Sequence, residues 1–244
     1  SNGLVIANAD DVNAMEVANT ARASVTSVGF SENATHRITR PEYGAGASFL
    51  LDGERFEIRL PGEFNVRNAA MAATAARHFG VAVSTIREAL ARFEGVKRRQ
   101  EVRGEIRGIT VIDDFGHHPT AIEQTLQALQ HQFKGRRLWA VFEPRSNTTR
   151  RAVFQQSLPI AFRGAHGVIF SKVARLEQLA PEERLDPERV IADIAASGKP
   201  AFYEPDVDAI IQRLKEHVHS GDVIIIFSNG GFDNIHKRLL SDLA

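Results

Sequence analysis

Cysteine is absent from this chain of 244 residues. Its absence excludes disulfide bonds, catalysis by a thiolate and metal sites with cysteine ligands. The sequence also has no apolar run that approaches the ~20 residues a helix needs to span a bilayer. No basic segment leads into an apolar stretch near its start, so no signal peptide is predicted. We therefore expect a cytoplasmic protein without a membrane partner.

Charge of either sign is not in excess, because 30 lysine and arginine residues balance 30 aspartate and glutamate residues. A neutral chain does not bind nucleic acid through its bulk charge, and we expect no nucleic-acid partner. Hydrophobic residues make up 43% of the chain, which is enough for a sizeable core. The length fits one large domain or two small ones.

A phosphate-binding loop with the Gly-x-x-x-x-Gly-Lys pattern is also missing. The one Gly-Lys pair, Gly198-Lys199, lacks the earlier glycine and is followed by Pro200. Gly44 and Gly46 do not begin a dinucleotide fingerprint, since the third glycine is absent and a hairpin, not a helix, is predicted after them. Neither of these two glycine-rich phosphate motifs is therefore present.

The first hundred residues alternate between strand and helix patterns. Asp52-Gly53 between two apolar stretches is a strong signal for a two-residue hairpin. Asp10 or Asp11 is suited to cap a first helix that we expect to end near Arg22. The expected strands are residues 4–7, 25–30, 47–51 and 55–60, the expected helices are 65–79 and one starting at Ser84, and residues 31–46 are expected to form a loop.

Residues 94–108 are charged and interrupted by glycines, and we interpret them as the junction between two domains, 1–103 and 104–244. Beyond the junction, apolar strands alternate with helices, which predicts an α/β fold with a Rossmann-like, doubly wound and mostly parallel sheet. Residues 223–227 are apolar without alternation and predict a central strand covered on both faces. The expected strands are 109–112, 138–142, 168–170, 201–203 and 223–227, and the expected helices are 119–133, 150–162, 187–196, 207–218 and 232–243.

The densest group of reactive side chains is Asp113-Asp114-Phe115-Gly116-His117-His118-Pro119, where a strand passes into a helix. Pro119 suits the first position of that helix, whose free N–H groups carry a partial positive charge of about half an elementary charge. A carboxylate before it can accept both hydroxyls of a ribose, and the histidines can donate to phosphate or carboxylate oxygens. The alternatives are a capped turn with exposed histidines, or a metal site, although adjacent side chains rarely converge on one ion.

Two segments before that turn can bind a nucleotide. Asn65 and Asn68 lie three residues apart, which places both amides on one face of a helix, and a carboxamide matches the hydrogen-bonding edge of adenine. The alternative is that Asn65 only caps the helix. Arg98 and Arg99 lie in a charged run, where arginine can bind phosphate with roughly 1.5–3 kcal/mol per charge-assisted bond, or simply face solvent.

Two loops that follow strands of the second domain can bind an anionic substrate. Arg145 and Asn147 come after the strand 138–142 and suit a ligand that bears a carboxylate. Ser228-Asn229-Gly230 follow the most buried strand, and glycine here lets a ligand approach backbone N–H groups. The alternatives are ordinary surface residues in the first loop and a tight turn in the second.

An Asn-x-x-Asn-Ala helix, an arginine before a short acidic step, and Asp-Phe-Gly-His-His-Pro, in this order, resemble the Mur ligase family of ATP-dependent enzymes. Members of this family join amino acids or peptides to UDP-N-acetylmuramic acid. The loops at 142–148 and 228–232 look like those of the members that attach the murein tripeptide during cell-wall recycling. The members that add L-alanine usually have Gln-Pro-His-Arg-Tyr and Gly-Ala-Gly-Asp in these loops.

The resemblance covers essentially the whole chain and implies the back half of a central ATP-binding domain, followed by a C-terminal peptide-binding domain. The phosphate loop, most Mg²⁺ ligands and the UDP-sugar domain would lie upstream, so the chain alone is expected to be inactive. The implied roles are adenine binding by Asn65 and Asn68, phosphate binding by Arg98 or Arg99, ribose binding by Asp114, tripeptide binding by Arg145, Asn147, Ser228, Asn229 and Gly230, and positioning or proton transfer by His117 and His118.

The implied reaction begins with phosphorylation of the muramyl carboxylate by ATP, after which the tripeptide amine attacks the acyl phosphate. The expected partners are ATP, Mg²⁺, UDP-N-acetylmuramate and L-alanyl-γ-D-glutamyl-meso-diaminopimelate. Three alternatives remain open: the L-alanine-adding ligase of the same family, a metal-dependent hydrolase that uses residues 113, 114, 117 and 118, and a non-catalytic nucleotide- or peptide-binding module.

Overall fold

The computed structural model describes residues 3–244, which form two compact units. The first unit ends at Gly95, and the second spans Val96–Ala244. They separate inside the charged segment 94–108, earlier than the boundary predicted after residue 103. The reason is that Glu101–Ile106 forms a strand, β6, which pairs with β7 of the second unit. Among residues 3–244 there is no helix that combines the length and the apolar character needed to cross a membrane.

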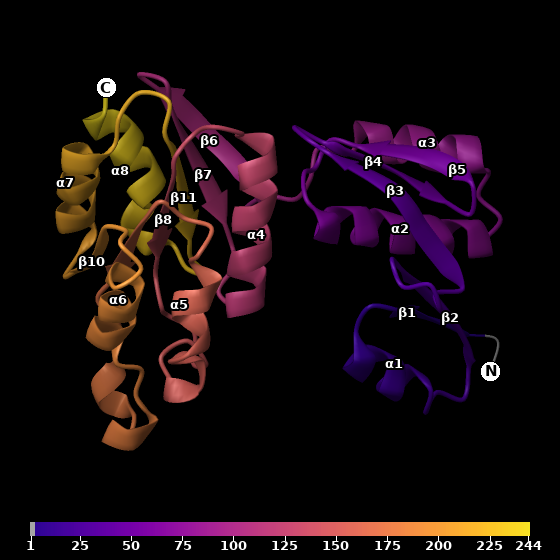
Figure 1. Cartoon of the computed structure of the whole chain (residues 1–244), viewed down its shortest axis with the longest axis horizontal. Helices are drawn as coiled ribbons and strands as arrows, with labels where there is room; N and C mark the ends of the chain where they lie inside the picture. The colour runs from indigo at the N-terminus through magenta and orange to yellow at the C-terminus, as the bar shows by residue number, and fades with distance from the viewer. Residues whose placement is uncertain (1–2) are drawn as a thin grey trace. The chain divides into compact units, whose positions relative to one another are not determined.

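The first unit contains a five-stranded sheet in the order β1-β2-β3-β4-β5 (Figure 1). Strands β1 to β3 are parallel, and β3, β4 and β5 are antiparallel to one another in turn. Alanines 69, 70 and 73 of the long helix are buried in the core of this unit, as small residues at a close packing face should be. The elements are β1 (Leu4–Asn8), α1 (Val12–Ala18), β2 (Ser24–Gly29), β3 (His36–Tyr43), β4 (Ala47–Leu51), β5 (Glu54–Ile58), α2 (Glu63–His78) and α3 (Val83–Arg92).

The hairpin predicted at Asp52-Gly53 is confirmed, with positive φ angles of 52° and 83° at the two turn residues. The loop predicted for 31–46 is wrong, because β3 occupies half of it. Only Ile38 of β3 is fully buried, so the strand lacks an apolar pattern and forms because its backbone pairs with β2 and β4. Helix α1 is capped by Asp11, as proposed, but ends at Ala18 and not near Arg22.

Asp10 joins the ends of the first two strands. Its carboxylate accepts hydrogen bonds from the backbone N–H groups of Phe30 (2.9 Å) and Ser31 (2.8 Å) and from Nε of Arg67 (2.9 Å). A Cβ on Gly29 would lie 2.8 Å from the carboxylate oxygens, so this approach requires glycine. Burial raises the pKa of Asp10, but the backbone hydrogen bonds and Arg67 outweigh it and hold the pKa below its usual value.

We therefore expect Asp10→Asn to destabilise the chain at pH 7 by about 2 kcal/mol, with a smaller difference from the parent at low pH. A lowered folded-state pKa means that the unfolded state binds more protons, so this contribution is present above the unfolded pKa of ~3.9 and is lost as pH falls through the folded value. Urea unfolding at pH 7, 5 and 3.5 measures it, with the exposed Glu32→Gln variant as control. A deficit that is the same at every pH would contradict this role of the ionised carboxylate.

The second unit has a six-stranded sheet in the order β10-β9-β8-β11-β7-β6. Every pair of neighbours is parallel except β6 and β7, which confirms the α/β prediction with a mostly parallel sheet. Strand β11 lies between β7 and β8, as its continuous apolar sequence predicted. The elements are β6 (Glu101–Ile106), β7 (Ile109–Asp114), α4 (Pro119–Gln132), β8 (Leu138–Phe142), α5 (Ser157–Ala161), β9 (Gly167–Ser171), α6 (Pro187–Ala195), β10 (Ala201–Glu204), α7 (Val207–His217), β11 (Val223–Phe227) and α8 (Ile235–Asp242).

Helices cover both faces of this sheet, with α7 and α8 on one side and α4 and α5 on the other (Figure 1). The side chains of β11 alternate between the two cores, because neighbouring residues of a strand point to opposite faces. Ile225 belongs to the core that contains α4, α5 and α6, whereas Ile224 and Ile226 belong to the core that contains α7 and α8. The unit is therefore doubly wound, as predicted.

Two predicted helices of this unit differ in the structure. The helix expected over 150–162 is wrong: a 3₁₀ turn, Ala152–Phe154, precedes the short α5, which contains Pro159 in its first turn. Proline lacks an N–H group and is tolerated only near the start of a helix, so α5 cannot extend far back toward residue 150. The helix expected from 232 begins only at Ile235, because Asp233 and Asn234 adopt positive φ angles of 47° and 53°.

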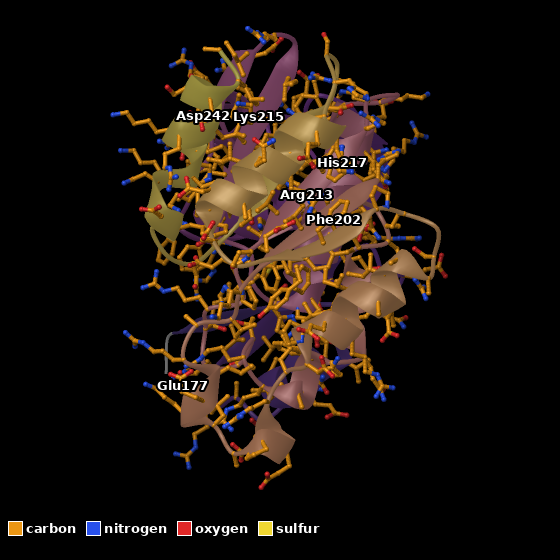
Figure 2. The ribbon with its side chains drawn as sticks, turned by 90° about the vertical axis from the view of Figure 1, so that its left-hand side faces the viewer. Glu177, Phe202, Arg213, Lys215, His217 and Asp242 are labelled. Carbon is orange, nitrogen blue, oxygen red and sulfur yellow. The ribbon has the colours of Figure 1, made fainter. Side chains whose placement is uncertain are left out.

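The edge strand β10 is fastened to α7 by a stack of side chains. Figure 2 shows Phe202, Arg213 and His217 lying together on this side of the unit. The Arg213 guanidinium lies 4.5 Å from the centre of the Phe202 ring, and the centre of the His217 ring lies 4.8 Å from the centre of the Phe202 ring. Nε of Arg213 also donates to Glu204 at 2.8 Å. These contacts hold the edge strand against α7.

Candidate functional site

The carboxyl ends of β8, β11 and β7 lie side by side at one edge of the second sheet. Their following loops, residues 143–150, 228–231 and 115–118, contain most of the side chains singled out in the sequence. Backbone hydrogen bonds join the loops, since Glu143 N–H donates to Phe227 and Ser228 N–H donates to Asp114. The structure therefore gathers three of the predicted segments at the edge where α/β sheets bind ligands.

Asp114 is 3% exposed, and its carboxylate accepts hydrogen bonds from the protein backbone. One carboxylate oxygen accepts from the N–H of Gly116 at 2.7 Å, and the other accepts from the N–H of Gln100 at 2.9 Å. Burial raises the pKa of Asp114 above its usual value, although these backbone donors and Arg99 act against the shift. The carboxylate thus connects the 98–101 turn to the 114–118 loop.

Asp113 is 4% exposed and lies between the side chains of Arg98 and His236. Its Oδ2 is 3.3 Å from Nε of Arg98, and its Oδ1 is 3.3 Å from Nε2 of His236 on α8. Burial raises the pKa of Asp113, but His236, Arg98 and Arg103 outweigh it and leave the pKa lowered. Sequence reasoning missed His236, which carries no motif and is separated from Asp113 by most of the domain.

Arg98 and Arg99 are adjacent, but the structure uses them differently. Arg98 donates from Nη2 to the backbone carbonyls of Ser228 (2.6 Å) and Gly230 (2.8 Å), in addition to its ion pair with Asp113. Arg99 is exposed and lies over the Phe115 ring, with its guanidinium carbon 5.3 Å from the ring centre. The guanidinium carbon of Arg98 also lies over the Phe115 ring, 5.4 Å from its centre, so the two side chains share this contact and differ in their hydrogen bonds and exposure.

The two histidines have defined tautomers in their neutral forms. Nδ1 of His117 lies 3.1 Å from the carbonyl of Phe115 and must donate to it, which leaves Nε2 as an acceptor. Nδ1 of His118 accepts from the N–H of Thr120 at 3.3 Å, which leaves Nε2 as the donor. His118 is thereby the cap of α4, and Pro119 takes the first helical position as predicted.

The loops after β8 and β11 are fastened by a hydrogen-bonded pair, Ser228 and the partly buried Glu143, that sequence reasoning had not assigned. Ser228 is fully buried, donates to Oε2 of Glu143 at 2.5 Å and accepts from the N–H of Gly230 at 2.9 Å. A Cβ on Gly230 would lie 2.1 Å from Nη1 of Arg145, so the guanidinium packs directly on the glycine backbone. Ser228 and Gly230 therefore shape the loop, while the exposed Arg145 and the partly exposed Asn229 face outward.

Asn147 is exposed in the loop after β8, and its Oδ1 accepts from Nη2 of Arg150 at 2.5 Å. Arg150 is only 8% exposed, although the expected helix over 150–162 would have allowed it to lie on the surface. The signal available in the sequence was the arginine itself, directly after a motif rich in hydrogen-bonding residues. Its burial follows from the irregular backbone that replaces the predicted helix.

In the first unit, Asn65 and Asn68 both lie on α2. The N-cap is Gly62, with φ of 98°, so the interpretation of Asn65 as the cap is wrong. Asn65 instead donates from Nδ2 to the carbonyl of Pro61 at 2.7 Å, whereas Asn68 is exposed. Because a carbonyl can only accept, this bond directs Oδ1 of Asn65 away from Pro61 as an acceptor.

No group of three or more histidine, aspartate or glutamate side chains within residues 3–244 is placed to hold a metal ion. Asp113, Asp114, His117 and His118 are each occupied by protein partners in different directions. The interpretation as a metal-dependent hydrolase therefore finds no ligand set in the described part of the chain.

Family models match both units of the chain. The model of the Mur ligase glutamate ligase domain matches residues 98–230, and the model of the Mur ligase middle domain matches residues 1–76. Among curated proteins, the UDP-N-acetylmuramate–L-alanyl-γ-D-glutamyl-meso-2,6-diaminoheptandioate ligase of Escherichia coli K12 is 41% identical over 199 residues, which cover 80% of this chain and 41% of that protein. The UDP-N-acetylmuramate–L-alanine ligase of Kineococcus radiotolerans is 34% identical and covers 99% of this chain and 52% of that protein.

A solved structure of a murein peptide ligase from Psychrobacter arcticus 273-4 superposes with a TM-score of 0.71 and 31% identity, over 99% of this chain and 51% of that one. The chain spans about half or less of the curated relatives it matches. One domain model covers more than half of the chain, and a second covers most of its first unit. The chain therefore belongs to the Mur ligase family.

Proposed function

We propose that this chain is part of an ATP-dependent ligase that joins UDP-N-acetylmuramate to L-alanyl-γ-D-glutamyl-meso-diaminopimelate in peptidoglycan recycling in the cytoplasm. Two relatives that carry the name of this activity are 41% and 39% identical to the chain. The observation that carries the proposal is the exposed Arg145 guanidinium seated on Gly230, where two neighbouring strands end. A cation at this edge suits a peptide with free carboxylates.

The nucleotide contacts that we propose lie on both units and are tested separately. On α2, Oδ1 of Asn65 is an acceptor suited to the amino group of adenine, and Asn68 lies one turn further along. In the second unit, Arg99 is the arginine that we assign to phosphate, because Arg98 is already bonded to Asp113 and to two carbonyls. Asp114 would support a ribose contact through the loop that it fastens. The described residues offer no cluster for Mg²⁺, and none is assigned as its ligand.

In the proposed reaction, the muramyl carboxylate attacks the γ-phosphorus of ATP and forms an acyl phosphate with release of ADP. The tripeptide amine then attacks the carbonyl carbon, and the tetrahedral intermediate collapses with loss of phosphate. The amine must lose a proton during this step. Nε2 of His117 is left as an acceptor in the loop just before α4. We therefore propose that it accepts the proton that the amine loses. His118 would donate to a substrate oxygen from its own Nε2.

The tripeptide assignment predicts that Arg145→Ala weakens tripeptide binding by about 1.5–3 kcal/mol, or roughly 10- to 150-fold. Gly230→Ala should cause a similar loss, because the added methyl group displaces the guanidinium. Calorimetry with the tripeptide measures both, and Arg163→Ala, which alters an exposed arginine beyond α5, is the control.

Unchanged affinity in Arg145→Ala would remove Arg145 from the proposed site.

The second candidate, the L-alanine-adding activity, is favoured by relatives that align over 99% of the chain. Competition between L-alanine and the tripeptide distinguishes the two activities. Displacement of bound tripeptide by L-alanine at comparable concentrations would favour the second.

A further inference from the structure

Arg150 is a buried cation without an acidic partner. It is 8% exposed, and within residues 3–244 its guanidinium bonds only to a backbone carbonyl and a side-chain amide, with no carboxylate in ion-pair contact. Nη1 donates to the carbonyl of Arg175 at 3.2 Å, Nη2 donates to Oδ1 of Asn147 at 2.5 Å, and Nε is buried without a hydrogen-bond partner. An uncompensated buried charge is costly, so a residue with this environment needs a reason beyond packing.

The contact with Asn147 fixes the direction of an exposed amide. A guanidinium has donors only, so the atom of Asn147 that faces Arg150 must be the oxygen. The NH₂ group of Asn147 is then on the opposite side of the amide plane, away from Arg150. Without Arg150, the amide could turn by 180° at little steric cost, because its oxygen and nitrogen are nearly equal in size.

We infer that Arg150 is a positioning residue that makes Asn147 a hydrogen-bond donor, so that the 145–147 loop selects a carboxylate over a carboxamide on the incoming peptide. Arg145, two residues away, also presents only donors. The unpaired charge of Arg150 adds attraction for an anion at the same place. This inference rests on the proposed function, since it assigns the group of the tripeptide that the loop would recognise.

Asn147→Asp tests the inference, because it changes one exposed atom and keeps the acceptor for Arg150. One carboxylate oxygen takes the place of Oδ1, and the other replaces the NH₂ donor with an acceptor. In the full chain, calorimetry should show tripeptide affinity reduced by about tenfold or more. A tripeptide whose recognised carboxylate is converted to a carboxamide should bind this variant better than it binds the parent. Three monoamidated peptides, one for each carboxylate, identify the group.

Arg150→Met tests the positioning role. Loss of positioning should change the preference between two peptides, whereas simple loss of a contact should weaken the binding of both. The parent should prefer the carboxylate peptide to its carboxamide by more than about tenfold, whereas Arg150→Met should retain only the smaller preference that Arg145 provides. Arg150→Lys, which keeps one donor toward Asn147, should restore most of the preference. Urea unfolding identifies a variant that fails to fold, and Arg150→Lys and Asn147→Asp then carry the test.

The outcomes separate this inference from the proposed function. If the parent binds the tripeptide and Asn147→Asp binds it equally well, the inference is overturned while the proposed function stands. If the parent binds no tripeptide, the proposed function and the inference built on it both fail. A preference for carboxylate that persists unchanged in Arg150→Met would show that Asn147 does not depend on Arg150.

Discussion

Replacing Asp222 with alanine is expected to lower the free energy of unfolding by about 3 kcal/mol, near the lower end of the range for breaking a buried ion pair. Asp222 is 3% exposed and accepts from Nε (2.9 Å) and Nη2 (2.5 Å) of Arg137, and from the N–H of His219 (2.8 Å). The variant removes three hydrogen bonds from one carboxylate. The loss stays near the lower end because Arg137 is 42% exposed and can turn toward water.

The effect should be on stability and not on binding. Asp222 lies just before β11, and its backbone carbonyl accepts from the N–H of Thr110 at the start of β7. It is therefore at the amino edge of the sheet, opposite the loops of the candidate site. Urea unfolding of the full chain measures the change, and calorimetry with the tripeptide should give an unchanged affinity for the folded variant.

Asp208→Ala is the matched control, because Asp208 is also paired with an arginine, Arg238, but is 83% exposed. An exposed pair contributes little, so this variant should differ from the parent by less than about 0.5 kcal/mol. Equal losses in the two variants would contradict the argument from burial. A loss of tripeptide affinity in folded Asp222→Ala would contradict the separation of the two edges.

The strands that the sequence predicted best are those covered on both faces. Both 138–142 and 223–227 have the predicted bounds, because every side chain of β8 and β11 is buried and the apolar run ends where the burial ends. Strands β3 and β6 were not predicted. One side chain of β3 and none of β6 is fully buried, so these strands form through backbone pairing with neighbours, which the local sequence does not record.

The motifs could be predicted, but the roles inside them depend on partners that are distant in sequence. Asp113 and Asp114 are adjacent on β7 and meet different partners, His236 and Gln100, because successive side chains of a strand point to opposite faces. Ser228 was predicted as a substrate contact from its position in a loop. Its burial against Glu143 arises only when β8 and β11 become neighbours.

The second large effect is expected for Arg98→Met, with Arg99→Met as its matched control. Arg98 contributes an ion pair with Asp113, which is 4% exposed, and two bonds to the carbonyls of the 228–230 loop. Its removal leaves Asp113 with His236 and the charge of Arg103, and it frees the loop on which Arg145 is seated. We expect a loss of about 3 kcal/mol in the free energy of unfolding, measured with urea. Calorimetry should show tripeptide affinity reduced by about tenfold.

Arg99→Met should give the opposite pattern. The exposed Arg99 side chain lies over Phe115, so its loss should leave unfolding and tripeptide affinity nearly unchanged. If Arg99 binds phosphate as proposed, ATP affinity measured by calorimetry should fall by about 1.5–3 kcal/mol. Two adjacent arginines would then have separate functions, one in holding the peptide loop and one in nucleotide binding. The assignment would be reversed if Arg98→Met weakened ATP binding and Arg99→Met did not. Arg98 would then be the arginine that binds the phosphates.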